Sequence, residues 1–436
     1  MAGERYVALG LAHVRSTWFT EVARWSTAGS LPLEFVKCVS AEDLRARLAS
    51  GRAFSAVLVD AGLSAVDRDL VDLATTQGCP VFAVDDGRGR DLTSLGVTAV
   101  LPADLGRSDL LDAFQQHTTM IGSVAAVPRA EHGDAVVAGW RGRLIAVTGR
   151  GGTGSSTVAM ALTQGLADDT RYAGMVALAD LSLDADLALL HDARDIVPGI
   201  QELVEAHRAG RPSPDEVRRL TFAIANRNYH LLLGLRRHRD WAALRPRALE
   251  AAIDGLRRAF RIVVADTDPD LEGEDQCGSY EVEERNLMAR TVIPTADVVM
   301  AVGSRGVKGL HGLVRVVHDL RDHGVPAARI LPIVNGANRN ARARAEVTRA
   351  FAELTGATHD DEPVVGPIFL PDRRAIDDLH RDGARLPSSL SAPLVGAVQA
   401  LLDRTGGRAG DGIGPSPKSV IPGSLGTWSD QEAASQ

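Results

Sequence analysis

The run of residues with the clearest chemical pattern is Gly149–Thr157, which reads GRGGTGSST. It follows the apolar stretch LIAVT, typical of a strand, and precedes VAMALTQGLA, whose apolar residues are typical of a buried helix. Glycines allow the tight backbone dihedrals and the close approach that a bound anion needs. The amide groups at a helix N-terminus supply positive potential. The sequence therefore predicts a phosphate-binding loop between a strand and a helix.

The spacing within this loop assigns chemistry to single residues. Gly149 and Gly154 are separated by four residues, as in a P-loop, and Ser156 stands where a P-loop places the hydroxyl that coordinates magnesium. The lysine that normally follows the last glycine and reaches the terminal phosphates is replaced by Ser155. We expect a loop that binds nucleotide with reduced catalytic power. A glycine-rich turn kept only for packing is the alternative.

The run resembles the deviant Walker A loop of the MinD/ParA class of P-loop ATPases, x-K-G-G-x-G-K-[ST]-[ST]. In that class the first lysine reaches across a dimer to the partner's nucleotide. Arg150 occupies this position and keeps the charge. The resemblance implies ATP and Mg²⁺ as cofactors. The residues it implies for cofactor binding in the loop are Gly151, Gly152, Thr153, Gly154, Ser155, Ser156 and Thr157.

An acidic segment after the next expected strand extends the resemblance. ALADLSLDADLALL, at 177–190, resembles the motif D-L-D-L-x-x-G-D-L-A of the CpaE branch of the class. Asp180 matches its first acid and Asp186 the later one, while Ser182 replaces the second acid. The resemblance implies that Asp180 orients the attacking water and that Arg150 acts on the phosphates, so these two are the candidate catalytic residues.

Two further segments supply metal and base contacts. RIVVADTDPD, at 261–270, resembles a Walker B strand, in which Asp266 would hold magnesium through water while Ser156 binds it directly. LPIVNGANR resembles the strand whose asparagine approaches the adenine, so Asn335 is the candidate for that contact. Together with segments 296–324 and 365–387, the resemblance covers roughly residues 143–403.

The N-terminal part of the chain, residues 1–118, alternates short apolar runs with helical patterns, which predicts a parallel, doubly wound sheet. Its size and order resemble a response-regulator receiver domain. Asp60 ends the third expected strand, where a receiver carries its phosphoacceptor. The first strand is followed by Gly10, Leu11 and Ala12, without a magnesium-binding acid, and no lysine follows the fifth. We therefore interpret Asp60 as a polar strand end in a pseudo-receiver. The strands expected in this part are 6–12, 33–39, 55–62, 80–87 and 97–104, and the helices are 16–25, 41–50 and 108–117, the last capped by Ser108.

The remaining chain divides into three parts. Residues 119–141 are small and irregular and are expected to form a linker, residues 142–403 carry the second α/β pattern, and residues 404–436, rich in Gly, Pro and Ser, are expected to be a disordered tail. The predicted fold class is α/β: a receiver-like (flavodoxin-like) domain followed by a MinD-like P-loop NTPase domain with a mainly parallel sheet. The strands expected in the second domain are 143–149, 175–181, 230–235, 261–268, 297–303 and 329–336.

Composition limits the classes of function. The 436 residues are 45% hydrophobic and 24% charged, enough for at least two cores, and the net charge of -8 argues against a dedicated nucleic-acid binder. Three scattered cysteines without a C-x-x-C pair argue against a disulfide framework or a zinc knuckle and favour a reducing cytoplasm. The start lacks the pattern of a secretory signal, and no segment has the roughly 18 apolar residues of a membrane span. Membrane contact is expected only through partners.

Clusters of arginine are the feature most compatible with DNA binding, because partition proteins of the ParA type bind DNA through such patches. Acids such as Glu346 are interspersed with them, so we interpret them as solvated helix faces. The clustered residues are Arg236, Arg237, Arg239, Arg339, Arg342, Arg344 and Arg349.

A receiver-like domain placed before a MinD-like ATPase is the arrangement of CpaE/TadZ proteins, which act in assembly of Flp (Tad) pili and related secretion systems. The resemblance implies a cytoplasmic homodimer, formed with ATP, that contacts pilus or secretion-system proteins at a cell pole or the membrane periphery. Ser155 and Ser182 remove a cation and an acid. Because losing one such group typically costs about 10²–10³ in rate, we expect weak or no hydrolysis. Two alternatives remain open: an active MinD/ParA-type ATPase in septum placement or DNA partition, and a nucleotide-free pseudo-ATPase scaffold.

Overall fold

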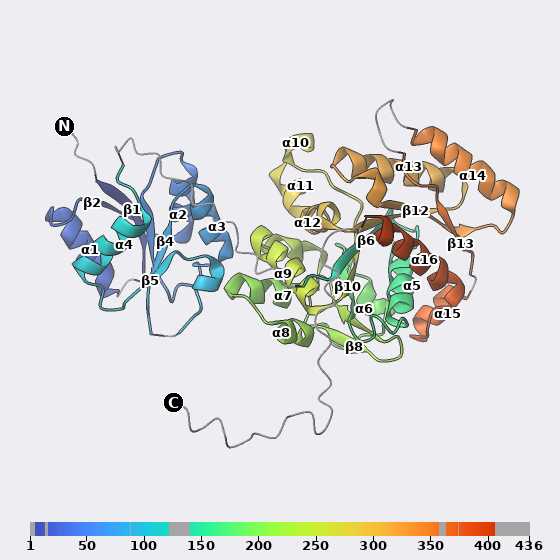
Figure 1. Ribbon diagram of the computed structural model, residues 1–436, viewed down its shortest axis with the longest axis horizontal. Helices are drawn as coiled ribbons and strands as arrows, with labels where there is room; N and C mark the ends of the chain where they lie inside the picture. Colours follow the sequence, from blue (N-terminus) through green and yellow to red (C-terminus); the bar gives the residue numbers. More distant parts are fainter. Residues whose placement is uncertain are drawn as a thin grey trace, which may run out of the picture.

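The computed structural model of the chain describes residues 5–13, 16–87, 89–121, 140–356, 363–373 and 375–405. These residues form two α/β units, each built on its own sheet (Figure 1). The predicted linker at 119–141 falls almost entirely outside the described residues, and the predicted tail falls outside them beyond residue 405.

The first unit is a sheet of parallel strands in the order β2-β1-β3-β4-β5. This is the flavodoxin-like order of doubly wound folds, and the predicted α/β class is confirmed. Its strands are β1 Tyr6–Leu11, β2 Leu33–Lys37, β3 Ala56–Asp60, β4 Val81–Val84 and β5 Ala99–Leu101. Its helices are α1 Thr17–Thr27, α2 Ala41–Ala49, α3 Arg68–Thr76, the short 3-10 helix η1 Thr93–Leu95 and α4 Arg107–His117.

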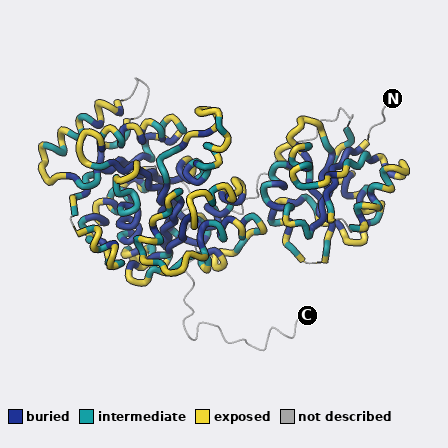
Figure 2. The backbone as a smooth tube through the Cα atoms, turned by 180° about the vertical axis from the view of Figure 1, so that it is seen from behind, coloured by how far each residue is buried: buried dark blue, intermediate teal, exposed yellow. Residues whose placement is uncertain are grey.

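Helices cover both faces of this first sheet. Every residue of β3 is buried, as expected for a parallel strand between two helical layers. One apolar cluster joins the sheet to α2 and α3, and a second joins it to α1 and α4. Figure 2 shows the buried strands as the dark centre of this unit.

Helix α4 starts differently from the sequence prediction. Gly106, not Ser108, is its N-cap. The carboxylate of Asp109 accepts a hydrogen bond of 2.9 Å from the Gly106 amide and so satisfies a donor at the helix start. The predicted Ser108 cap is wrong because the acid after it, rather than the hydroxyl, bonds the backbone ahead of the helix.

The second unit is a sheet in the order β13-β12-β11-β6-β10-β7-β9-β8. Only β8 runs antiparallel to its neighbour among these described strands, so the mainly parallel sheet is confirmed. The sequence pattern missed β8 and β13, which are only three and four residues long. The strands are β6 Arg143–Gly149, β7 Val176–Leu181, β8 Phe222–Ile224, β9 Tyr229–Leu232, β10 Ile262–Thr267, β11 Val298–Ser304, β12 Ile330–Ala337 and β13 Ile368–Pro371.

The helices of the second unit form a layer on each face of this sheet (Figure 1). On one face lie α5 Ser155–Ala167, α6 Leu187–Leu190, α15 Ile376–Arg381 and α16 Ser388–Thr405. On the other lie α7 Ile200–Ala209, α8 Pro214–Arg219, α9 Pro246–Ala259, α12 Leu287–Thr295, α13 Gly306–Asp322 and α14 Ala341–Leu354. The remaining short helices are η2 His238–Ala243, α10 Glu274–Cys277, α11 Tyr280–Arg285 and η3 Ala327–Arg329. Helix α16 crosses the predicted boundary at residue 403. No helix within the described part of the chain is long and apolar enough to span a membrane.

Helix α5 is the central helix of its layer. Most of its residues are buried because it lies between the sheet and α16. Its position explains the apolar run VAMALTQGLA, because a surface helix would expose part of these apolar side chains to water. The buried Gln164 uses both ends of its amide on the backbone of Leu386, at 2.8 and 2.9 Å. This pair ties α5 to the segment that leads into α16.

The two units meet through α3 of the first and α7 and α9 of the second. The Arg208 guanidinium lies 3.3 Å from the buried Asp67 carboxylate and donates to the Ser64 carbonyl at 2.9 Å. Arg68 donates in return to the carbonyls of His207 and Gly210. An arginine of each unit therefore donates hydrogen bonds to the other unit, and these bonds hold the C-terminal end of α7 against the N-terminal end of α3.

Candidate functional site

The predicted phosphate loop lies between β6 and α5, at the carboxyl edge of the sheet. Gly152 and Gly154 have φ values of +78° and +82°. Residues other than glycine rarely adopt this backbone conformation. A Cβ placed on Gly151 or on Gly152 would meet nothing within 4 Å. The loop therefore presents a bare backbone toward open space, as a site that receives an anion requires.

The N-terminus of α5 is free to face this space. Gly154 is its N-cap, and no side chain caps it by a hydrogen bond. The first amides of an α-helix have no partner within the helix, and in this 13-residue helix their dipoles point toward the loop. Thr153 instead stabilises the loop itself, because its amide and its hydroxyl both donate to the Arg150 carbonyl, at 3.1 and 2.8 Å.

Asn335 holds the loop from the neighbouring strand β12. Its side-chain amide donates to the Thr153 carbonyl at 2.9 Å, and its side-chain oxygen accepts from the Gly336 amide at 2.9 Å. A Cβ on Gly154 would lie 2.4 Å from the Asn335 nitrogen, so the contact also requires glycine there. The sequence predicted an adenine contact for Asn335, and in this structure its side-chain amide binds the backbone of the loop and of its own strand. Its role in this structure is to position the loop.

Asp266 lies at the end of β10, next to the start of α5. It is 3% exposed, and its carboxylate accepts a hydrogen bond from the Ser156 hydroxyl. Burial, and then repulsion from Asp180, raise the pKa of Asp266 to about 8. The structure therefore brings together the two residues predicted to hold magnesium.

Asp180 lies beside Asp266 but is turned into its own strand end. One oxygen accepts from the Ser182 hydroxyl at 3.0 Å, and the other accepts from the Leu187 amide at 2.9 Å. The residue is fully buried, and burial raises its pKa to about 6. Both oxygens hold the turn after β7, but a carboxylate has about four acceptor positions, so the role of orienting a water stays a prediction.

Thr157 also points away from the expected ligand. Its hydroxyl is 3.0 Å from the Nε2 atom of His380, on α15. This contact directs the Thr157 hydroxyl toward α15, while the Thr157 backbone stays in the first turn of α5. The partner could not be predicted from the sequence, because His380 lies 223 residues away with no motif around it.

Arg150 is exposed at the outer edge of the loop. Its Cδ atom lies 3.5 Å from the position that a Cβ would take on Gly312, so its side chain runs along α13 of the same chain. A larger residue at Gly312 would compete for that path. The stem of the Arg150 side chain thus lies against α13, and no hydrogen bond or ion pair within the described residues holds its guanidinium.

Sequence reasoning missed Asp268, which completes this edge of the sheet. Its carboxylate accepts a hydrogen bond of 2.7 Å from the Leu183 amide, which ties the end of β10 to the turn after β7. Burial raises its pKa. The signal was present in the alternating acids of DTDPD, but the resemblance assigned a role only to the first of them.

The protein side chains alone do not form a metal cage. Within the described ranges, no group of three or more His, Cys, Asp and Glu residues is arranged to hold a metal ion. Magnesium is usually held by one or two protein groups, with waters and substrate phosphates as the other ligands. Ser156 and Asp266 fit that mode.

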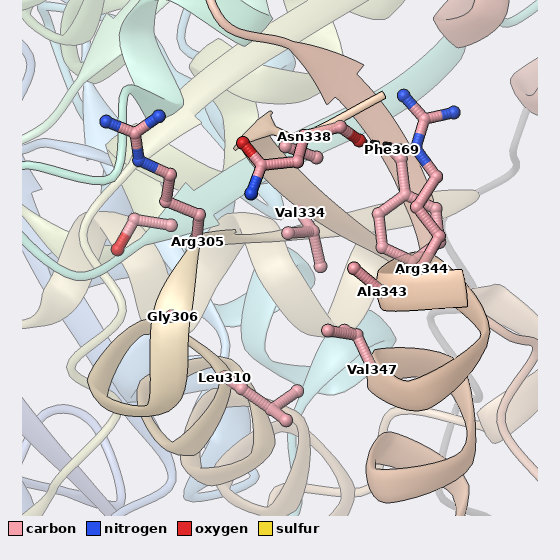
Figure 3. A pocket seen from close by; sticks show the side chains of 11 residues that line it. Arg305, Gly306, Leu310, Val334, Asn338, Ala343, Arg344, Val347 and Phe369 are labelled. Atoms are coloured by element: carbon pink, nitrogen blue, oxygen red, sulfur yellow. Dashed lines mark hydrogen bonds between the residues drawn. The ribbon is translucent and has the colours of Figure 1, made fainter. Parts of the chain in front are cut away.

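A second cavity lies on the opposite face of β12 (Figure 3). Successive side chains of a strand point to opposite faces, so Val334 lines this cavity while Asn335 faces the phosphate loop. Leu310, Val347 and Phe369 form its apolar walls, and the Arg344 guanidinium lies over the Phe369 ring at 5.5 Å. The cavity is therefore separate from the phosphate loop.

In the first unit, Asp60 is buried at the end of β3. Its carboxylate accepts hydrogen bonds from the Ser16 hydroxyl and from the His13 amide, the latter at 3.4 Å. These bonds come from the segment that follows β1, where a receiver would place its metal-binding acids. Asp60 thus joins two loops, in keeping with its interpretation as a polar strand end.

Comparison with known proteins gives similarity in structure only. No protein-family model matches the chain, and no curated protein matches it. The ParA family ATPase from Chlorobium tepidum TLS has a TM-score of 0.47 and 16% identity, over 59% of this chain and 98% of that one. The Pyrococcus furiosus cell division ATPase MinD has a TM-score of 0.43 and 18% identity, over 60% and 99%. The septum site-determining protein MinD of Pyrococcus horikoshii OT3, complexed with Mg-ADP, has a TM-score of 0.43 and 18% identity, over 62% and 99%. At these values the similarity assigns neither family nor function.

Proposed function

We propose that this chain is a nucleotide-binding protein of the MinD type that binds Mg-ATP at Gly149–Thr157. The observation that carries the proposal is the bare glycine loop ahead of an uncapped α5, with Ser156 and Asp266 paired beside it. Magnesium and the triphosphate would supply the cation and the phosphate oxygens that this site lacks. The amides of the loop and of the first turn of α5 would bind the phosphates, and Ser156 and Asp266 would hold the metal.

The site favours binding over turnover. Ser155 replaces the lysine that would reach the terminal phosphates, and Ser182 replaces the second acid of the motif after β7. Catalysis of phosphoryl transfer depends on positioned cations and on a group that orients the nucleophile. Both contributions are reduced here, so we expect slow or no hydrolysis.

Arg150 supplies the cation for a nucleotide-gated homodimer. Its side chain is anchored along α13, and its tip lies outside the loop, free to reach the phosphates of a second copy. By resemblance to CpaE/TadZ proteins, the dimer would present a composite surface to components of a Flp/Tad pilus or a related secretion system. The first unit would act as a pseudo-receiver that serves docking, and polar localisation would follow from the partners.

Sedimentation of the full chain with and without Mg-ATP tests this function. We expect a monomer without nucleotide and a dimer with Mg-ATP, and we expect Arg150→Ala to bind nucleotide but remain monomeric. Arg349→Ala, an exposed arginine of α14 remote from the loop, is the control. A dimer that forms equally with and without Mg-ATP would favour the nucleotide-free scaffold instead.

A further inference from the structure

The most deeply buried cation of the second unit has no counter-ion. Arg227, in the turn between β8 and β9, is 1% exposed. Its guanidinium donates to the Ala384 carbonyl at 2.7 Å and to the Tyr229 hydroxyl at 3.4 Å, while its Nε atom has no partner. Within the described residues, no carboxylate lies within ion-pair distance of it. A buried charge without a counter-ion is unfavourable, and an anionic ligand would compensate it.

Arg227 lines an open polar cavity. The cavity has a volume of about 220 Å³, far more than the roughly 10–15 Å³ that a single water needs. Arg381 adds a second guanidinium at the rim, where Asp378 is its local partner. The lining residues are His191, Asp192, Ile224, Asn226, Arg227, Arg381, Asp382 and Gly383.

The electrostatics of the cavity favour an anion at its floor. The two lining acids, Asp192 and Asp382, are exposed to solvent, where water and salt screen them. Arg227 is buried, so its charge acts more strongly than that of an exposed arginine on a ligand that touches it. The buried neighbours of Arg227 within the described residues carry no negative charge. The Tyr229 hydroxyl is 2.6 Å from the Nε2 atom of His191. The Nδ1 atom of His380 has no hydrogen-bond partner.

We propose that this cavity binds a small oxyanion, held by the guanidinium of Arg227 and drawn in by Arg381. A planar guanidinium binds phosphate or carboxylate through two parallel hydrogen bonds, and the buried Nε atom of Arg227 has no other partner in this structure. The cavity is separated from the phosphate loop by His380, whose other ring nitrogen contacts Thr157 at 3.0 Å. It is therefore a second anion site beside the first.

Because the phosphate loop also attracts anions, the test needs a background in which that loop is closed to them. Ser155→Asp places a negative charge in the first turn of α5, which suits the helix dipole but repels an anion. Calorimetric unfolding of this full-length variant is measured at constant ionic strength with inorganic phosphate or acetate as the probe. A ligand that binds only the folded chain raises Tm with its concentration. We expect one of the two anions to do so, and the stronger of them identifies the oxyanion.

Adding Arg227→Met to the Ser155→Asp background should weaken the anion's apparent affinity at least tenfold. Where Arg227→Met does not fold, Arg381→Gln at the rim takes its place and should weaken the affinity about threefold, with Arg349→Gln as the exposed control. Three results would overturn the site: no effect of either anion, an effect lost with Ser155→Asp alone, or an effect that neither cavity variant changes. The second of these would place the anion at the phosphate loop only.

Discussion

Asp266 and Asp180 are register partners on the adjacent parallel strands β10 and β7, with both carboxyl groups buried on the same face of the sheet. Asp266 faces Ser156 and the start of α5, whereas both oxygens of Asp180 accept hydrogen bonds from its own turn. Neither has a cation in contact among the described residues. The pair therefore destabilises the protein without a ligand, and its cost would be recovered when a metal ion binds.

Asp266→Asn should stabilise the ligand-free protein by about 2 kcal/mol at pH 7, because it removes a buried carboxyl that must take up a proton or carry its charge away from water, a cost to which repulsion from Asp180 adds. Asp180→Asn should do the opposite, because its new amide group would face the Ser182 hydroxyl or the Leu187 amide, which are donors. Urea denaturation of both variants measures the difference. Destabilisation of equal size in the two would contradict the asymmetry described here.

Ser155→Lys restores the cation that a P-loop uses on the terminal phosphates. If the loop binds ATP, the variant should hydrolyse it about 10²-fold faster than the wild-type chain, because one positioned charge contributes that much to phosphoryl transfer. Release of phosphate under steady state measures it. Ser155→Met, which matches the length of the stem without the charge, is the control and should leave turnover unchanged.

Asn335→Ala separates loop positioning from base recognition. Losing the bond to the Thr153 carbonyl should cost about 1 kcal/mol and weaken every nucleotide about fivefold. A base contact would instead weaken ATP while leaving GTP unchanged. Binding of both nucleotides to Asn335→Ala, and to Asn338→Ala as the control on the same strand end, decides between the two roles.

His207 should make stability fall in mild acid. Burial lowers its pKa to about 4, from about 6.5 in an unfolded chain. The unfolded state therefore takes up the proton first, and the folded state loses up to about 3 kcal/mol as pH falls from 6.5 to 4. Asp266 and Asp180, whose pKa values are raised, act in the opposite direction, so variants are compared with the wild type. On acidification from pH 6.5 to 4, His207→Leu should gain stability relative to the wild type, whereas His311→Leu, an exposed control, should not.

Arg208→Ala should release the first unit from the second. The variant loses the ion pair with Asp67 and the bond to the Ser64 carbonyl, which together stabilise the docked arrangement by about 2 kcal/mol. Small-angle scattering should show a larger radius of gyration with unchanged circular dichroism. Arg171→Ala, which removes only a local pair with Asp169, should leave the radius as it is.

The sequence was informative wherever a local pattern carried the structure. Continuous apolar runs identified the long parallel strands, and the glycine loop was placed correctly between β6 and α5. It failed for β8 and β13, which are too short to show a period. It also misplaced the cap of α4, where a glycine and a later acid act together.

The site was less predictable than the fold, because its decisive contacts join distant residues. The bond from Asn335 to Thr153 spans 182 residues, and that from Thr157 to His380 spans 223. A motif gives the type of a side chain but not the direction in which neighbouring strands turn it. The engagement of Asp180 by its own turn is of the same kind, since a carboxylate after a strand is equally suited to a ligand and to a backbone amide.

Calorimetric titration of the full chain with Mg-ATP tests the central claim most directly. The account predicts saturable binding that is weakened at least tenfold in Asp266→Asn and unchanged in Asp270→Asn, an acid of the same segment that pairs with Arg285 instead of the loop. Absence of binding at millimolar Mg-ATP would contradict it, and the glycine loop would then be an element of the fold alone.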